Sequence, residues 1–135
     1  MFLLHPTLER DTIEITRLKL CRVLLMRDST YPWLILAPQR EDMRDLDDLS
    51  PDDRLLAMIE IDQVSKAMKS LFHPDKMNVA ALGNIVEQLH IHVIARFKAD
   101  PAWPKPVWGV QPPKDYEDAE RDALTARLAR ALKSG

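Results

Sequence analysis

The chain has 135 residues and a mass of 15.5 kDa, the size of one domain with a hydrophobic core of its own. Hydrophobic residues make up 46% and charged residues 30%, a balance that excludes an intrinsically disordered protein. The net charge is −2, so the chain has no general electrostatic attraction for nucleic acid or an anionic membrane, and we expect neither as a partner. We expect a single domain over residues 1–135.

Three features of the sequence indicate the cellular compartment of the protein. Cys21 is the single cysteine, which excludes an internal disulfide and favours a reducing environment. Residues 1–6 lack the basic region and the long apolar stretch of a secretory signal. No apolar segment approaches the roughly 20 residues that span a bilayer. The sequence therefore predicts a cytoplasmic protein.

The first part of the chain predicts strands. Apolar runs within residues 12–26 indicate one or two strands, and residues 27–32 have the Asp, Ser and Pro content of a turn. Residues 33–37 form a short continuous apolar run closed by Pro38, which is typical of a strand covered on both faces. The acidic run 42–53 then predicts a solvated loop that leads into a helix.

A long helix begins at Ser50. Ser50 is a favoured N-cap, Pro51 suits the first helical position, and two aspartates follow in the first turn. Apolar residues then recur every three or four positions, as on one face of a helix. Because proline disfavours helical backbone in the residue before it, the helix should end near His73 and Pro74.

The rest of the chain predicts two strands, an arm and a second helix. Residues 76–82 and 88–97 are the strand candidates. Residues 100–113 contain five prolines and two tryptophans, which predicts an extended arm that packs by its rings. Residues 115–133 have the spacing of an amphipathic helix. The order of elements is that of a mixed α+β domain.

Two of the four histidines share a strand with a glutamine. The alternation of polar and apolar residues from 88 to 93 places Gln88, His90 and His92 on one face, each about 6.6 Å from the last at roughly 3.3 Å per residue. The opposite, core-facing side would carry Leu89, Ile91, Val93 and Ala95. His5 and His73 each precede a proline at an element boundary, where a surface or capping role is the ordinary interpretation.

Three interpretations of Gln88, His90 and His92 remain open. The side chains are half-buried polar residues of a sheet face, or metal ligands, or catalytic groups. A zinc site needs three or four ligands, and Cys21, His5 or a carboxylate would have to converge from far away, so we expect no metal. In the catalytic interpretation a neutral imidazole attacks phosphorus while neighbouring polar groups stabilise the phosphoryl oxygens.

Residues 83–96, GNIVEQLHIHVIAR, resemble the signature of the histidine triad (HIT) superfamily. That signature has a glycine with a glutamine or asparagine, then three histidines separated by single apolar residues, then two further apolar residues. The order of elements is similar across residues 12–110. The resemblance implies an α+β, HIT-like fold with an antiparallel sheet of about five strands and two main helices, assembled as a homodimer.

The resemblance also implies a reaction. His90 stands at the nucleophile position and would attack the α-phosphate of a purine nucleotide conjugate, a dinucleoside polyphosphate or a nucleoside phosphoramidate. Water would then resolve the nucleotidyl-histidine intermediate, without a metal or cofactor. His92 would hydrogen-bond the phosphoryl group or the bridging atom. Before the attack His90 must be neutral, so its other ring nitrogen should donate to a backbone carbonyl.

One departure from the signature affects the catalytic set. Gln88 occupies the first histidine position, which makes the chain a Gln-His-His variant. A glutamine side chain donates and accepts hydrogen bonds but does not titrate near pH 7. We include Gln88 with His90 and His92 as catalytic residues. The alternative is a nucleotide-binding or partner-binding module in which Gln88 has weakened or abolished catalysis.

Four further residues are candidates for substrate binding. Asn84 matches the amide of the glycine-amide pair, and Ile85 could serve through its backbone N–H alone. Asn78 is a phosphate or ribose candidate, and Asp28 is the nearest acid to the ribose-binding position. Each amide could equally cap a loop, and Asp28 could equally be an ordinary turn residue. The tryptophans of residues 100–113 either cover the leaving group, as in some relatives, or hold the arm to the core.

Overall fold

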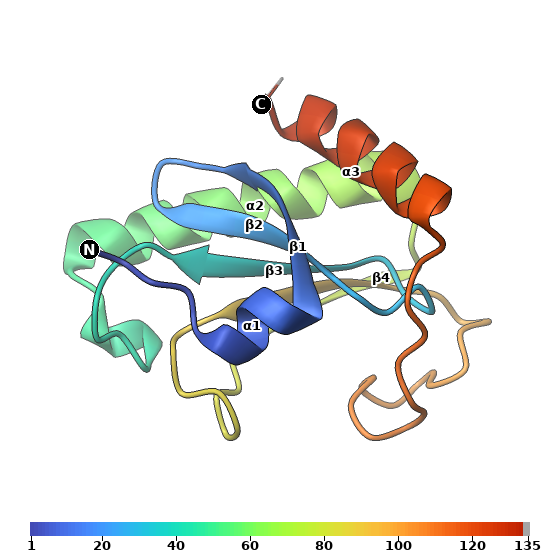
Figure 1. Ribbon diagram of the computed structural model, residues 1–135, viewed down its shortest axis with the longest axis horizontal. Coiled ribbons are helices and arrows are strands. Elements are labelled where there is room, and N and C mark those ends of the chain that lie inside the picture. The colour runs from blue at the N-terminus through green and yellow to red at the C-terminus, as the bar shows by residue number, and fades with distance from the viewer. Residues whose placement is uncertain (134–135) are drawn as a thin grey trace.

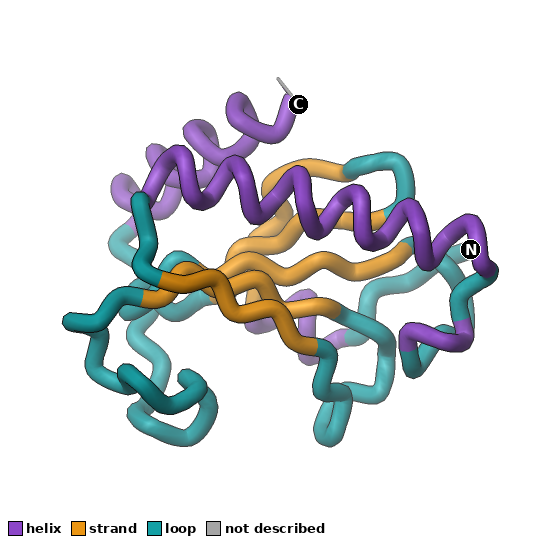
Figure 2. The backbone as a smooth tube through the Cα atoms, turned by 180° about the vertical axis from the view of Figure 1, so that it is seen from behind, coloured by secondary structure: helices purple, strands orange, loops and turns teal. Residues whose placement is uncertain are grey.

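A computed structural model describes residues 1–133 and contains one antiparallel sheet with the strand order β1-β2-β3-β5-β4. The strands are β1 (Thr12–Arg17), β2 (Cys21–Met26), β3 (Trp33–Pro38), β4 (Lys76–Ala80) and β5 (Ile91–Arg96). Two long helices, α2 (Pro51–Phe72) and α3 (Asp118–Lys133), lie on the same side of this sheet (Figures 1 and 2). The expected five-stranded α+β fold with two main helices is confirmed.

The ends of α2 follow the expected chemistry. The Ser50 side chain accepts a hydrogen bond from the Asp53 N–H at 3.1 Å, and Pro51 opens the helix. His73 ends it in a left-handed conformation with φ 51°, directly before Pro74. Neither long helix of residues 1–133 has the length and apolar character that crossing a membrane requires.

The strand that follows residue 88 is shorter than the alternation predicts. β5 begins at Ile91, which pairs with Leu36 of β3. Before that point the Leu89 N–H donates to the Met43 carbonyl of the loop after β3 instead of to a strand. The ladder between β3 and β5 ends at Leu36 and Ile91, and continuing its register would set Leu89 opposite Pro38, which has no N–H to donate.

Two short elements were not predicted. These are α1 (Pro6–Asp11) and a 3₁₀ turn, η1 (Leu46–Asp48). His5 caps α1, because its Nδ1 accepts a hydrogen bond from the Thr7 N–H at 3.0 Å, so the capping interpretation of His5 is confirmed. Six residues are too few to show a helical period. Yet α1 lies across the face of the sheet opposite α2 and α3 (Figure 1).

Both faces of the sheet are buried, each by a different set of elements. The expected core-facing residues of the histidine segment pack into the cluster that includes side chains of α2 and α3; they are Leu89, Ile91, Val93 and Ala95. A second cluster covers the other face and joins β3 and β5 to α1 and to the arm; it includes Leu8, Trp33, Ile35, Ile94 and Val107. The histidines belong to this second face.

A buried ion pair fixes the proline-rich arm to the sheet. The Arg96 guanidinium donates through Nε and Nη2 to both carboxylate oxygens of Asp100, at 2.8 and 3.0 Å, and through Nη1 to Asn78 Oδ1 at 2.8 Å. The Asp100 carboxylate also accepts backbone N–H groups within residues 97–103. The Trp103 ring packs over the same guanidinium. The arm is thereby anchored beside the end of β5.

Candidate functional site

A cleft of about 350 Å³ opens on the face of the sheet that α1 covers in part. Its walls come from α1, β2, β3, the loop after β4, the histidine segment and the arm; they include Thr7, Leu8, Asp11, Met26, Trp33, Ile35, residues 82–86, His90, His92 and Trp108. Most of these side chains are apolar, and a few polar groups converge among them. That composition and size are typical of a small-molecule site.

His90 lies just before β5, and its tautomer follows from one contact. Its Nδ1 is 2.7 Å from the Gln88 carbonyl oxygen. Because a carbonyl only accepts, Nδ1 carries the proton and Nε2 keeps a lone pair. Burial lowers the pKa of His90 below its ordinary value, with a smaller contribution from His5, while the Gln88 carbonyl acts in the opposite direction. His90 is therefore neutral near pH 7, with the expected backbone partner.

His92 has the opposite tautomer, and the register of the sheet explains why. Ile35 lies opposite His92, which places Trp33 two residues along β3 on the same face, within diagonal reach. The Trp33 Nε1–H donates to His92 Nδ1 at 3.0 Å. Because an indole N–H only donates, His92 Nδ1 has no proton and Nε2 carries it. Burial, followed by the nearby His90, lowers the pKa of His92 to about 4.

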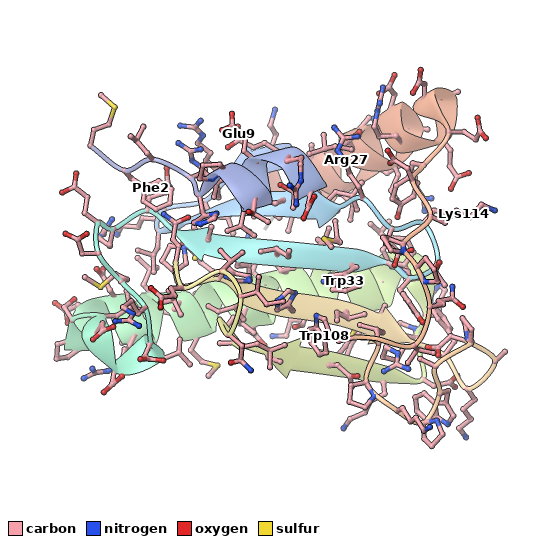
Figure 3. All side chains as sticks on the ribbon, turned by 60° about the horizontal axis from the view of Figure 1, so that its bottom comes forward. Phe2, Glu9, Arg27, Trp33, Trp108 and Lys114 are labelled. Carbon is pink, nitrogen blue, oxygen red and sulfur yellow. The ribbon has the colours of Figure 1, made fainter. Side chains whose placement is uncertain are left out.

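The two imidazoles form a small aromatic cluster with two tryptophans. The His90 and His92 ring centroids are 4.9 Å apart. Trp108 from the arm stands edge-on to His92 at 5.0 Å and to Trp33 at 5.8 Å, and Figure 3 shows both indoles on the cleft side of the sheet. The two histidines that line the cleft therefore carry one Nε2 lone pair, on His90, and one Nε2–H donor, on His92.

Gln88 does not line the cleft with the histidines. Its Oε1 accepts from the His5 N–H at 2.8 Å, and its Nε2 donates to the Leu3 carbonyl at 2.9 Å. The side chain thus ties the N-terminal segment to the residues that precede β5. Its influence on His90 passes through its own backbone carbonyl, which holds the imidazole Nδ1–H.

The family model described as the HIT domain matches residues 7–99, more than half of the chain and including both histidines of the cleft. The chain belongs to the HIT domain family. The search of curated proteins found no match. Among residues 1–133, no three His, Cys, Asp or Glu side chains converge in a way that could hold a metal ion.

Solved structures of other HIT proteins are similar over nearly the whole chain. A histidine triad protein from Marinobacter aquaeolei is 45% identical with a TM-score of 0.96, covering 99% of this chain and 98% of its own. One from Bradyrhizobium japonicum is 44% identical with a TM-score of 0.95, covering 97% and 98%. A hypothetical histidine triad nucleotide-binding protein from Sulfolobus tokodaii is 16% identical with a TM-score of 0.67, covering 93% and 87%, and shares the fold.

Two of the candidate binding residues of this HIT domain lie at the cleft. Asn84 and Ile85 are exposed on the loop that lines it, and Ile85 is 94% exposed. Gly83 in this loop has φ 76°, a left-handed conformation that glycine adopts without strain. The loop therefore presents the Asn84 amide and the Ile85 backbone at the mouth of the cleft, where a ligand would meet them.

The other two candidates lie elsewhere in the HIT fold. The side-chain oxygen Oδ1 of Asn78 accepts from Arg96 Nη1, and Asn78 does not line the cleft. Asp28 is buried in the turn between β2 and β3, where its Oδ1 accepts from the Thr30 N–H at 3.1 Å and from the Lys114 N–H at 3.3 Å. The contacts of Asp28 are those of a turn residue, one of the two roles that the sequence left open.

The sequence does not indicate two features of the site, the partner of His92 and one wall of the cleft. Trp33 sits in an apolar run that reads simply as a buried strand, although a buried indole N–H usually has an acceptor. Thr7, Leu8 and Asp11 reach the cleft from α1, which is too short to be predicted from its period. The capping pattern of His5 and Pro6 was the available indication of a helix there.

Proposed function

We propose that this HIT protein is a nucleotide hydrolase or transferase that acts on the α-phosphate of a nucleotide conjugate through a nucleotidyl-His90 intermediate. The observation that carries the proposal is the contact between His90 Nδ1 and the Gln88 carbonyl, which leaves the Nε2 lone pair on a ring that lines the cleft. The lowered pKa of His90 keeps that nitrogen unprotonated at neutral pH. An unprotonated imidazole is the form that can attack phosphorus.

The reaction has two steps, transfer of the nucleotidyl group to His90 and its hydrolysis. First, the Nε2 lone pair forms a bond to the α-phosphorus, the bond from phosphorus to the leaving atom breaks, and that atom departs with the bonding electrons. Next, water attacks the same phosphorus, the phosphorus–nitrogen bond breaks, and its electrons return to Nε2. Water gives up one proton to solvent, and the product is a nucleoside monophosphate. A different acceptor in place of water would make the protein a transferase.

The neighbouring groups suit the charges that develop. The nucleotidyl-imidazole is cationic, and its Nδ1–H still donates to the Gln88 carbonyl, which stabilises the added positive charge. The His92 Nε2–H can donate to a phosphoryl oxygen or to the bridging atom, where negative charge accumulates. The apolar walls of the cleft suit a purine nucleoside, and the loop with Asn84 and Ile85 suits its phosphate.

The alternative is a binding module that has lost catalysis through Gln88. The contacts of Gln88 favour the enzyme. Its side chain is engaged by Leu3 and His5, and its carbonyl provides the contact that prepares His90. A backbone carbonyl is present whichever side chain stands at that position. A glutamine in place of a histidine at position 88 therefore keeps the hydrogen bond that leaves His90 Nε2 unprotonated.

Incubation with diadenosine tetraphosphate or adenosine phosphoramidate tests the proposal. We expect release of AMP, loss of turnover in His90→Ala with the fold intact, and a smaller loss in His92→Ala. A binding module would be stabilised by AMP without releasing it from either compound. A metal-dependent hydrolase would lose its activity in a chelator. Unchanged turnover in His90→Ala would refute the assignment.

We also propose that the protein is a homodimer. β4 is an edge strand of the sheet among the described residues, and α2 exposes an apolar row of Leu55, Met58 and Ile59. A two-fold copy could continue the sheet and cover such a row. Light scattering should give twice the mass of the chain, and Met58→Glu should shift it toward the monomer. A monomeric mass for the wild-type protein would contradict the proposal.

A further inference from the structure

The hydrogen bond from Trp33 does more than hold the His92 ring. If His92 carried its proton on Nδ1, two N–H donors would face each other across 3.0 Å, and the same conflict would arise if both ring nitrogens were protonated. The Trp33 indole nitrogen always carries its hydrogen, so it can only donate and cannot adapt to a protonated His92 Nδ1. Trp33 therefore excludes two of the three protonation forms of His92.

We propose that Trp33 is a positioning residue that holds His92 as a neutral Nε2–H donor, and that this cleft consequently favours leaving groups that depart as anions over leaving amines. The proposal rests on the function proposed above and names the class of conjugate that fits it best. That class is the phosphoanhydrides, such as dinucleoside polyphosphates, in preference to nucleoside phosphoramidates.

The preference follows from what each leaving group needs. When an anhydride is cleaved, the bonding electrons stay on a phosphate oxygen, which is a stable anion and needs hydrogen bonds but no proton. When a phosphoramidate is cleaved, the departing nitrogen takes the electron pair and must also gain a proton. A neutral His92 can donate a hydrogen bond to either group, but giving up its one proton would leave an imidazolate.

Among residues 1–133, the side chains that line the cleft around His92 offer no substitute proton donor. Among the described residues that line the cleft, the other titratable side chains are His90 and Asp11. His90 is the nucleophile, and the Asp11 carboxylate is paired with Arg10 at 2.9 Å. The strands beside His92 place Ile35 and Ala80 opposite it, and Trp108 covers its edge from the arm. With a pKa of about 4, about one His92 ring in a thousand is protonated at pH 7.

Nitrogen NMR of histidine-labelled protein tests the positioning role without any substrate. In the wild-type protein, His92 should show the Nε2–H tautomer from pH 5.5 to 8. In Trp33→Phe, the Nδ1–H form should appear and the midpoint of protonation should rise by about one pH unit, the effect of one hydrogen bond. Trp108→Phe is the matched control, since it removes the other indole against His92 without removing the donor. The control should keep the wild-type tautomer and midpoint.

Two results would overturn the positioning role. One is an Nδ1-protonated His92 in the wild-type protein, which can be observed even if Trp33→Phe fails to fold. The other is a folded Trp33→Phe in which His92 keeps both the wild-type tautomer and the wild-type midpoint, because burial alone would then account for its state.

The substrate preference is tested by kcat/KM for diadenosine tetraphosphate and for adenosine phosphoramidate at pH 6. The wild-type ratio should favour the anhydride. Trp33→Phe should lower that ratio by up to about tenfold, because a midpoint one unit higher gives tenfold more protonated His92 to serve the leaving amine. Trp108→Phe should leave the ratio unchanged, whatever it does to each rate.

A wild-type preference for the phosphoramidate, or an unchanged ratio in Trp33→Phe, would overturn the preference. A failure of the proposed function would give a different result from a failure of the substrate preference. If the wild-type protein turns over neither compound, the enzymatic assignment fails, whereas the NMR experiment still decides whether Trp33 sets the state of His92.

Discussion

The burial of His92 predicts a loss of stability in mild acid that a single substitution should remove. Burial, and then His90, lowers the pKa of folded His92 from its ordinary 6.5 to about 4. Between these values the unfolded chain binds a proton that the folded chain does not, so this contribution to stability is complete above pH 6.5 and is lost as the pH falls toward 4. At 1.36 kcal/mol per pKa unit, the loss is about 3 kcal/mol.

His92→Gln is the informative substitution. A glutamine does not titrate, its amide oxygen can accept the Trp33 N–H, and its amide nitrogen can donate into the cleft. Urea denaturation of both proteins from pH 7.5 to 4.5 gives two curves of unfolding free energy against pH, in which the carboxylates contribute equally. The wild-type curve should fall about 2.5 kcal/mol further than the variant curve by pH 4.5. Parallel curves would refute the reasoning.

Three further predictions concern stability and reactivity. Asp100→Ala leaves the Arg96 guanidinium, which is 1% exposed, without its charged partner, and should lower the free energy of unfolding in urea by about 3–5 kcal/mol. Gln88→Ala removes two hydrogen bonds to residues 3–5, and should cost about 1–2 kcal/mol and speed hydrogen exchange there. Burial, followed by Glu60, raises the pKa of the Cys21 thiol, so a thiol reagent at pH 8 should modify Cys21 only after unfolding.

Each of these predictions has its own contrary result. A stability loss below about 1 kcal/mol in Asp100→Ala would mean that the ion pair does not anchor the arm. Gln88→Glu keeps the acceptor for His5 but sets a carboxylate oxygen against the Leu3 carbonyl, so it should destabilise the protein at least as much as Gln88→Ala. Exchange at residues 3–5 that is identical in all three proteins would exclude the tether. Rapid labelling of native Cys21 would show that its surroundings open easily.

The sequence predicts most of the fold because the determinants of its elements are local. Ser50 and Pro51 define one end of α2 and Pro74 the other, and the alternation of apolar residues around His90 identifies the core-facing side of β5. β5 is shorter than predicted because of residues outside the segment itself. Residues 88–90 leave the ladder because Met43 accepts the Leu89 N–H and Pro38 closes β3.

In the candidate site, too, the local contacts could be predicted from the sequence and the long-range contacts could not. The two histidines and the backbone partner of His90 lie within residues 88–92, so the motif and the chemistry of imidazole are sufficient to anticipate them. Trp33 is 59 residues from His92, and only the register of β3 against β5 places its indole on that ring. The N-terminal residues that hold the Gln88 side chain lie 83 and 85 positions away, and no local pattern indicates that contact.

Mass spectrometry after a brief exposure to diadenosine tetraphosphate tests most directly whether His90 is the nucleophile. We expect a covalent nucleotidyl adduct on His90 that forms within the first turnover and disappears as AMP is released. Peptide mapping should locate it on that residue, and His90→Ala should carry none. Release of AMP through an adduct on another side chain, or continued release from His90→Ala, would exclude His90 as the nucleophile.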